Sequence, residues 1–171
     1  MPPKVILFGP MGAGKSTVGA LLSEKLNCDF ADTDKLIEAD QGKSINEIFV
    51  EDGESHFRLV EESVVIDALL ERDGVVSLGG GAILSEATQS ALRDSNGLKV
   101  FLDISLAAVA PRVGFNTERP LLLVNPRQKW QELMVARRPI YEALSDLKIE
   151  VSDLKIEEIV DQIIQAVKID S

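Results

Sequence analysis

Short apolar runs, each about as long as a β-strand, alternate with longer amphipathic stretches along most of the chain. The runs span four to six residues each and lie at 4–8, 28–32, 75–78, 99–104 and 148–152. In the stretches between them, apolar residues recur every three or four positions, which is typical of helices. This spacing predicts helices at 15–26, 33–40, 44–52, 54–72, 85–95, 127–145 and 155–169. Strands that alternate with helices indicate an α/β fold, a parallel sheet with helices on both faces, and ligands bind at the carboxyl ends of its strands.

The alternation breaks between residues 105 and 126. The segment begins with helical spacing, but Pro111 lacks an N–H and is unfavourable inside a helix, so we expect the helix to end there. Gly114 and Pro120 then mark a loop. We expect residues from about 112 to 125 to form a lid that closes over the ligand and excludes water.

Composition limits the class of protein. The 171 residues are enough for one domain with a sizeable core, and 45% of them are hydrophobic. The net charge of −10 argues against a nucleic-acid partner, which needs a basic surface. No stretch is long enough to span a membrane, and the first apolar run is too short for a signal peptide. One cysteine excludes an internal disulfide. We therefore expect a cytoplasmic protein, which we also expect to be a monomer.

Residues 9–16 read G-P-M-G-A-G-K-S, the spacing of a phosphate-binding loop. Glycines let successive N–H groups point into one concavity, and the helix that follows adds its own free N–H groups. Lys15 can bridge the terminal phosphates of ATP, and the Ser16 hydroxyl can bind Mg²⁺. A simple glycine-rich turn is the alternative, but the strand before and the helix after favour phosphate binding. The nucleotide is expected on Gly12, Ala13, Gly14, Lys15, Ser16 and Thr17.

Two carboxylates, Asp32 and Asp34, follow the second predicted strand. In an extended chain residues two apart face the same side, so the two can act together. One would lie near Mg²⁺ and the other would accept a hydrogen bond from a substrate hydroxyl. The alternative is that Asp34 only caps the next helix.

Gly79, Gly80 and Gly81 follow the third predicted strand. Three glycines in a row indicate very close approach of another group to the backbone, with N–H donors exposed, although a flexible turn is the alternative. Arg58 lies on a predicted helix and is a candidate to bind an anion. It could equally form surface ion pairs with Glu54, Glu61 and Glu62.

Together these motifs resemble those of the shikimate kinase family. The resemblance rests on G-P-M-G-A-G-K-S-T at 9–17, D-T-D at 32–34, I-x-E-I-F at 45–49 and D-G-E-x-x-F-R-x-x-E at 52–61. It continues with S-L-G-G-G-A at 77–82, N-T-x-R-P-L-L at 116–122 and R-x-P-x-Y at 137–141. The matches keep their order over most of the chain.

The resemblance implies a P-loop fold of the nucleoside-monophosphate-kinase kind: three layers, with five parallel strands in the order 2-3-1-4-5 and a lid. The substrate-binding segment would span about 33–61. The activity would be ATP-dependent phosphorylation of the 3-hydroxyl of shikimate, a step towards chorismate and the aromatic amino acids. Catalysis is expected from Lys15, Asp34 and Arg119. Shikimate would bind Asp34, Arg58, the three glycines and Arg137, whereas Arg112 and Arg119 would contact ATP. Ser16 and Asp32 would hold Mg²⁺.

Two other functions are weighed against this one. Another small kinase of the same fold would share the phosphate loop, but not Asp34, Arg58 and the three glycines together. A GTP-binding switch would carry an N-K-x-D motif, which does not occur. The sequence does not decide which of two adjacent residues, Arg137 or Arg138, is the pocket arginine.

Overall fold

The computed structural model describes residues 3–113 and 125–170. Within them lies one five-stranded sheet with the strand order β2-β3-β1-β4-β5. Its strands are β1 (Val5–Phe8), β2 (Phe30–Asp32), β3 (Val75–Ser77), β4 (Leu98–Asp103) and β5 (Leu147–Glu150). All four pairings are parallel. The parallel α/β sheet and the expected strand order are therefore confirmed.

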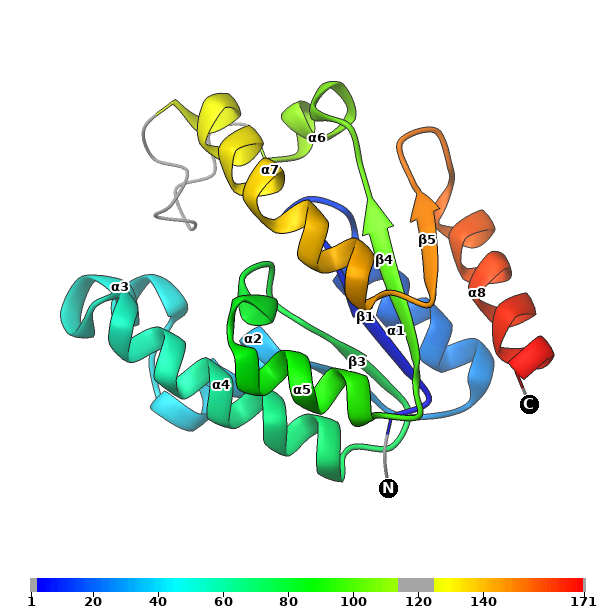
Figure 1. Ribbon diagram of the computed structural model, residues 1–171, viewed down its shortest axis with the longest axis horizontal. Coiled ribbons are helices and arrows are strands. Elements are labelled where there is room, and N and C mark those ends of the chain that lie inside the picture. Colours follow the sequence, from blue (N-terminus) through cyan, green and yellow to red (C-terminus); the bar gives the residue numbers. More distant parts are fainter. Residues whose placement is uncertain (1–2, 114–124, 171) are drawn as a thin grey trace.

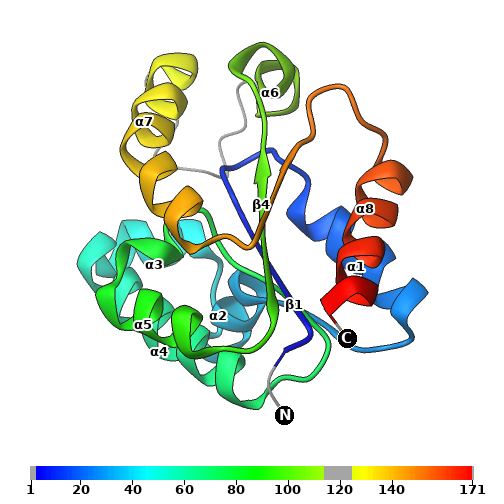
Figure 2. The ribbon, with the colours of Figure 1, turned by 45° about the vertical axis from the view of Figure 1, so that its right-hand side comes forward.

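Helices cover both faces of this sheet. Their bounds are α1 (Lys15–Leu26), α2 (Thr33–Gln41), α3 (Ile45–Asp52), α4 (Glu54–Glu71), α5 (Glu86–Asp94), α6 (Leu106–Val113), α7 (Pro126–Leu144) and α8 (Ile156–Asp170). Helices α1 and α8 pack together on one face, while α4, α5 and α7 lie on the other (Figures 1 and 2). Every residue of β1 and β4 is buried, which explains why the central strands are nearly continuous apolar runs.

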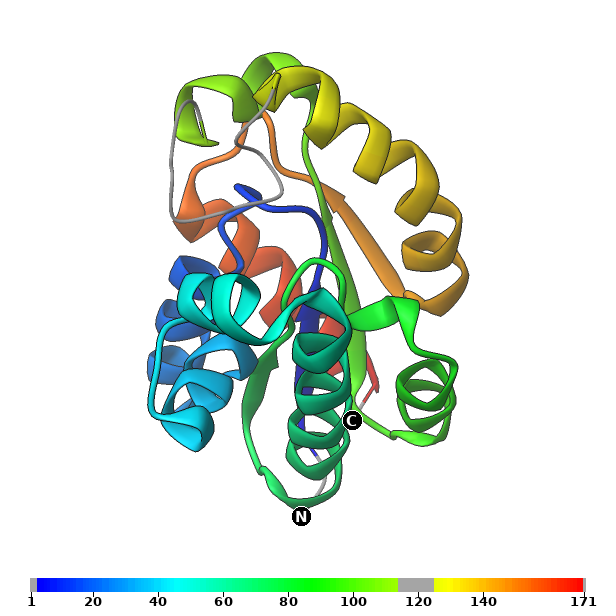
Figure 3. The ribbon, with the colours of Figure 1, turned by 90° about the vertical axis from the view of Figure 1, so that its left-hand side faces the viewer.

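A second, smaller core lies between α2, α3 and α4. Ile37, Ile48 and Phe57 are buried there and separate from the main core of the sheet. Figure 3 shows this three-helix unit on one side of the turn after β3, with α7 on the other. The unit covers the range in which a substrate-binding segment is expected.

The structure corrects the expectation that Pro111 ends its helix. Helix α6 continues past it to Val113, and α7 likewise runs through Pro139. A proline leaves the carbonyl four residues earlier without a partner. Here those carbonyls belong to Ala107 and Val135, which are both exposed, so water can satisfy them.

The structure contains one element that the pattern of hydrophobic positions did not predict. Residues Ala82–Leu84 form a single 3₁₀ turn, η1, directly after the glycines. Its N–H groups bond back to the carbonyls of Gly79 and Gly81, which gives the glycine turn a defined shape. No helix among residues 3–113 and 125–170 is long and apolar enough to cross a bilayer.

Candidate active site

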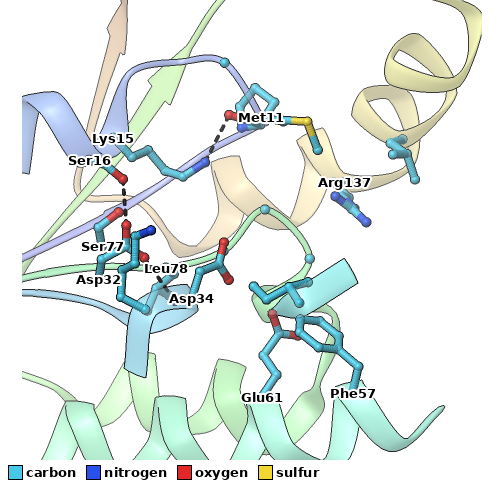
Figure 4. Close-up of a pocket in the computed structure, with 18 of the residues that line it drawn as sticks. Met11, Lys15, Ser16, Asp32, Asp34, Phe57, Glu61, Ser77, Leu78 and Arg137 are labelled. Atoms are coloured by element: carbon cyan, nitrogen blue, oxygen red, sulfur yellow. Dashed lines mark hydrogen bonds between the residues drawn. The ribbon is translucent and has the colours of Figure 1, made fainter. Parts of the chain in front are cut away.

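A pocket of about 860 Å³ opens at the carboxyl edge of the sheet. Its walls come from the loop after β1, the end of β2, the α2–α3–α4 unit, the turn after β3 and helix α7. Figure 4 shows Lys15, Asp34 and Arg137 reaching this space from three different elements. Residues far apart in the sequence thus meet at the edge where an α/β sheet is expected to bind ligands.

The phosphate-binding loop has the backbone that its glycines predict. Gly12 and Gly14 have φ of +87° and +92°, values at which a side chain would be strained. Helix α1 begins immediately afterwards, at Lys15. The Lys15 ammonium donates to the carbonyls of Gly9 and Pro10 at 2.7 and 3.0 Å, so the loop curls around the cation.

Asp32 bonds in two directions. Its Oδ2 accepts a hydrogen bond of 2.7 Å from Ser16 Oγ, and its Oδ1 accepts one of 3.0 Å from the backbone N–H of Asp34. The second bond caps α2, so the idea that Asp34 is the cap is wrong. Asp32 has the extended backbone that a cap needs, whereas Asp34 already lies in the first helical turn. Asp34 lines the pocket, and its carboxylate lies against Gly79.

Each of the three glycines admits a different charged side chain. A Cβ on Gly79 would lie 2.6 Å from Asp34 Oδ1. One on Gly80 would lie 3.3 Å from Arg137 Nη1, and one on Gly81 would lie 2.5 Å from Arg58 Nη1. The expected close approach to the glycines is therefore present, and it is made by the protein's own side chains.

Arg58 forms an ion pair, but mostly not at the surface. Its Nη1 lies 2.6 Å from Glu61 Oε1, and the Glu61 side chain is only 4% exposed. Burial raises the pKa of Glu61, while the charge and hydrogen bond of Arg58 oppose that rise. Glu54 makes a longer contact of 3.7 Å, and Glu62 bonds Ser85 instead. The pair holds the guanidinium against the glycine turn.

The structure separates the two adjacent arginines of α7. Arg137 is buried and lines the pocket beside Gly80. Arg138 points elsewhere and pairs with Asp103 at the end of β4, with 2.7 Å between Nη1 and Oδ2. The geometry thus selects Arg137 as the pocket arginine.

Of the two remaining predicted arginines, Arg112 and Arg119, the structure describes only Arg112. Arg112 is exposed, and its Nη1 donates to the Gly12 carbonyl at 3.1 Å, so it reaches the phosphate loop despite Pro111. Arg119 and most of the expected lid lie outside the described residues.

Sequence reasoning overlooked three residues of the site. Glu61 looks like an ordinary surface partner for Arg58, and only its burial reveals otherwise. Trp130 and Tyr141 look like core aromatics and are buried, yet both line the pocket and bond its loops. The only signal for Tyr141 is its place in the R-x-P-x-Y motif.

The pocket has a charge pattern suited to an anionic hydroxylated substrate and a polyphosphate. Lys15 lies on the phosphate loop, and two guanidinium groups, of Arg58 and Arg137, flank the glycine turn. Arginine can bind a carboxylate through two parallel hydrogen bonds, and a nearby aspartate can accept a hydroxyl proton.

Comparisons with known proteins agree with this chemistry. A model of the shikimate kinase family matches residues 11–168. The shikimate kinase of Thermobifida fusca is 47% identical, over 91% of this chain and 90% of that protein. That of Streptomyces avermitilis is 43% identical, over 98% and 96%. A solved structure of shikimate kinase from Acinetobacter baumannii, in complex with shikimate, superimposes with a TM-score of 0.94 at 34% identity. It covers 100% of this chain and 95% of that one.

Proposed function

The chain belongs to the shikimate kinase family, and from that premise we propose how its own residues phosphorylate shikimate. The reaction moves the γ-phosphoryl group of ATP to the 3-hydroxyl of shikimate, giving shikimate 3-phosphate and ADP. The bond from the γ-phosphorus to the bridging oxygen of ADP breaks as the bond to the 3-oxygen forms. The hydroxyl proton must leave in the same reaction. Positioning and charge neutralisation are the main tasks of such a site.

Shikimate binds between the glycine turn and α7 in this proposal. Its carboxylate pairs with the guanidinium groups of Arg58 and Arg137, which already flank Gly80 and Gly81. The bare glycines Gly79, Gly80 and Gly81 let the ring approach the backbone. Glu61 keeps Arg58 in this place through its buried ion pair.

Asp34 accepts the proton of the 3-hydroxyl. Its carboxylate faces the pocket beside Gly79, while the cap of α2 is made by Asp32. A positioned carboxylate holds the hydroxyl for in-line attack and takes its proton as the new bond forms. Asp34 therefore serves as both substrate ligand and base.

ATP binds along the phosphate loop. The N–H groups of Gly12, Ala13 and Gly14, and of residues 15–17 at the start of α1, surround its phosphates. When ATP binds, the Lys15 ammonium gives up its hydrogen bonds to the loop carbonyls and binds the γ-phosphate instead. Arg112 lies against the adenine, and Arg119 meets the γ-phosphate when the lid closes.

Mg²⁺ fits the oxygen atoms beside the loop. The hydroxyl of Ser16 and the carboxylate of Asp32 lie together at 2.7 Å, and Mg²⁺ is usually held by one or two such oxygens with waters and substrate phosphates. When bound, the ion neutralises charge that develops on the phosphates.

One observation carries this proposal: the glycine turn holds Arg58, Arg137 and Asp34 around one space that faces the phosphate loop. The test is to mix the purified protein with ATP, Mg²⁺ and one acceptor at a time, and to follow ADP release. Shikimate should support turnover, whereas gluconate and nucleoside monophosphates should not. Release of ADP with either control acceptor at the rate seen with shikimate would refute the assignment. We also expect a cytoplasmic monomer, which sedimentation and cell fractionation can check.

A further inference from the structure

Helix α7 contacts the pocket through two buried hydrogen-bond donors. Trp130 Nε1 donates to the Met11 carbonyl in the phosphate loop at 2.9 Å. Tyr141 Oη donates to the Gly80 carbonyl in the glycine turn at 2.5 Å. The two residues are eleven positions apart, about 16 Å along the axis and on the same helix face. A single rigid helix therefore touches both substrate-binding loops.

Each accepted hydrogen bond also fixes a neighbouring N–H. A carbonyl and the N–H of the next residue share one planar trans peptide and point in opposite directions. When Trp130 holds the Met11 carbonyl towards α7, the N–H of Gly12 points away from the helix. Tyr141 sets the N–H of Gly81 in the same way. Gly12 and Gly81 both line the pocket.

We propose that Trp130 and Tyr141 are positioning residues, each orienting the peptide that binds a different substrate. Trp130 orients the Met11–Gly12 peptide for the phosphates of ATP. Tyr141 orients the Gly80–Gly81 peptide for shikimate. The assignment of substrates rests on the proposed function. Glycine has little steric preference of its own, so without these bonds the two peptides would rotate easily.

The Tyr141 hydroxyl and the Trp130 indole N–H both keep their role as hydrogen-bond donors. Tyr141 is fully buried and stacks on Phe101 with ring centres 5.0 Å apart. Burial raises the pKa of its phenol to about 12, so the O–H remains protonated wherever the enzyme works. The indole N–H of Trp130 can only donate. A backbone carbonyl can only accept, so neither bond can reverse.

Anchoring α7 to the sheet does not depend on these bonds. Arg138 and Asp103 pair outside the pocket, and Met134 and Leu144 of α7 are buried in the main core. Removing one donor should therefore leave the helix in place and release only one loop.

The experiment compares Tyr141→Phe with Trp130→Phe, each of which removes a donor and keeps an aromatic ring. Tyr141→Phe should raise the KM for shikimate on the order of 10-fold, the scale of one hydrogen bond. Its KM for ATP should change less than about 2-fold. Trp130→Phe should show the reverse, with an equally weakened affinity for ADP in direct binding. In both variants kcat should fall less than KM rises.

Arg138→Ala is the control, because it loosens α7 from β4 without touching either loop. It should lower the melting temperature and raise both KM values, because a displaced α7 moves Trp130 away from the phosphate loop and moves Arg137 and Tyr141 away from the glycine turn. The proposal is overturned if the two phenylalanine variants show that same undivided pattern, or if neither changes either KM. A wild-type protein inactive on shikimate would instead refute the proposed function, and the effect of Trp130→Phe on ADP binding would still test its own half.

A second measurement uses the wild-type protein, so it does not depend on the variants folding. The backbone amide signals of Gly12 and Gly81 are followed by nuclear magnetic resonance during titration. Gly12 should shift with ADP alone and Gly81 with shikimate alone. If the Gly12 signal does not shift with ADP and the Gly81 signal does not shift with shikimate, the orientation we infer for these peptides is wrong.

Discussion

Replacing Gly81 by alanine would test whether the glycine turn leaves room for Arg58. The backbone there has φ −99° and ψ 3°, which alanine can adopt, so little backbone strain is expected. The new Cβ would lie 2.5 and 2.6 Å from the two terminal nitrogens of Arg58. Ordinary contacts are about 3.5–4.0 Å, so the guanidinium must retreat by about 1 Å. A misplacement of that size costs on the order of 10²-fold in rate. We expect kcat/KM for shikimate to fall by about that factor, with KM for ATP unchanged.

Steady-state kinetics and thermal unfolding together give the assay. Gly42→Ala is the matched control: its φ is +69° and nothing lies within 4 Å, so alanine there should cost about 1–2 kcal/mol of stability and leave kcat/KM intact. The decisive comparison is a double-mutant cycle with Arg58→Ala. If Gly81→Ala lowers kcat/KM by the same factor in that background, alanine does not act by displacing the guanidinium, and our explanation of the turn is wrong.

Three further predictions concern single residues. Asp34→Asn should lower kcat by about 10²-fold or more, the scale of lost acid–base help, and a near-normal kcat would leave no proton acceptor at that position. Arg119→Ala should lower kcat by about 10³-fold with a much smaller change in ATP affinity, whereas equal losses would contradict an arginine that acts in the transition state. Tyr141 is the single tyrosine, and burial raises its pKa to about 12, so the absorbance of tyrosinate should appear only near that pH in the folded protein. Because the unfolded phenol ionises first, near pH 10, the free energy of unfolding should fall between about pH 10 and 12; a folded midpoint near 10 would contradict the burial argument.

The elements around the phosphate-loop motif were predictable because the sequence signal for them is local. The G-x-x-x-x-G-K-S spacing requires a strand before it and a helix after it, and both are present. Continuous apolar runs likewise predict the buried central strands, because both faces of a parallel sheet are covered. The position of the three glycines at the ligand edge follows from the same pattern.

Other features depended on contacts between distant segments. Whether Asp32 or Asp34 caps α2 is decided by one residue's backbone angles, which spacing does not reveal. Glu61 resembles any helix residue three positions from an arginine, and only the packing of α4 against the turn buries it. The continuation of α6 past Pro111 depends on the exposure of Ala107 one turn earlier, again a property of the folded surface.

The ion pair of Arg138 with Asp103 has a consequence for how α7 finds its rotation. Two neighbouring arginines on one helix are about 100° apart, so a roll of the helix by about that angle would present Arg138 to the pocket in place of Arg137. The Asp103 side chain is 7% exposed, and its other cation, Lys148, lies farther away, with 3.8 Å between Nζ and Oδ2, so losing the contact with Arg138 is unfavourable. Rolling α7 would therefore break the ion pair between the half-exposed Arg138 and the buried Asp103. The orientation of Arg137 towards the pocket is thus held by an ion pair that lies outside the pocket. The second arginine, Arg138, fixes the rotation of α7 by pairing with Asp103.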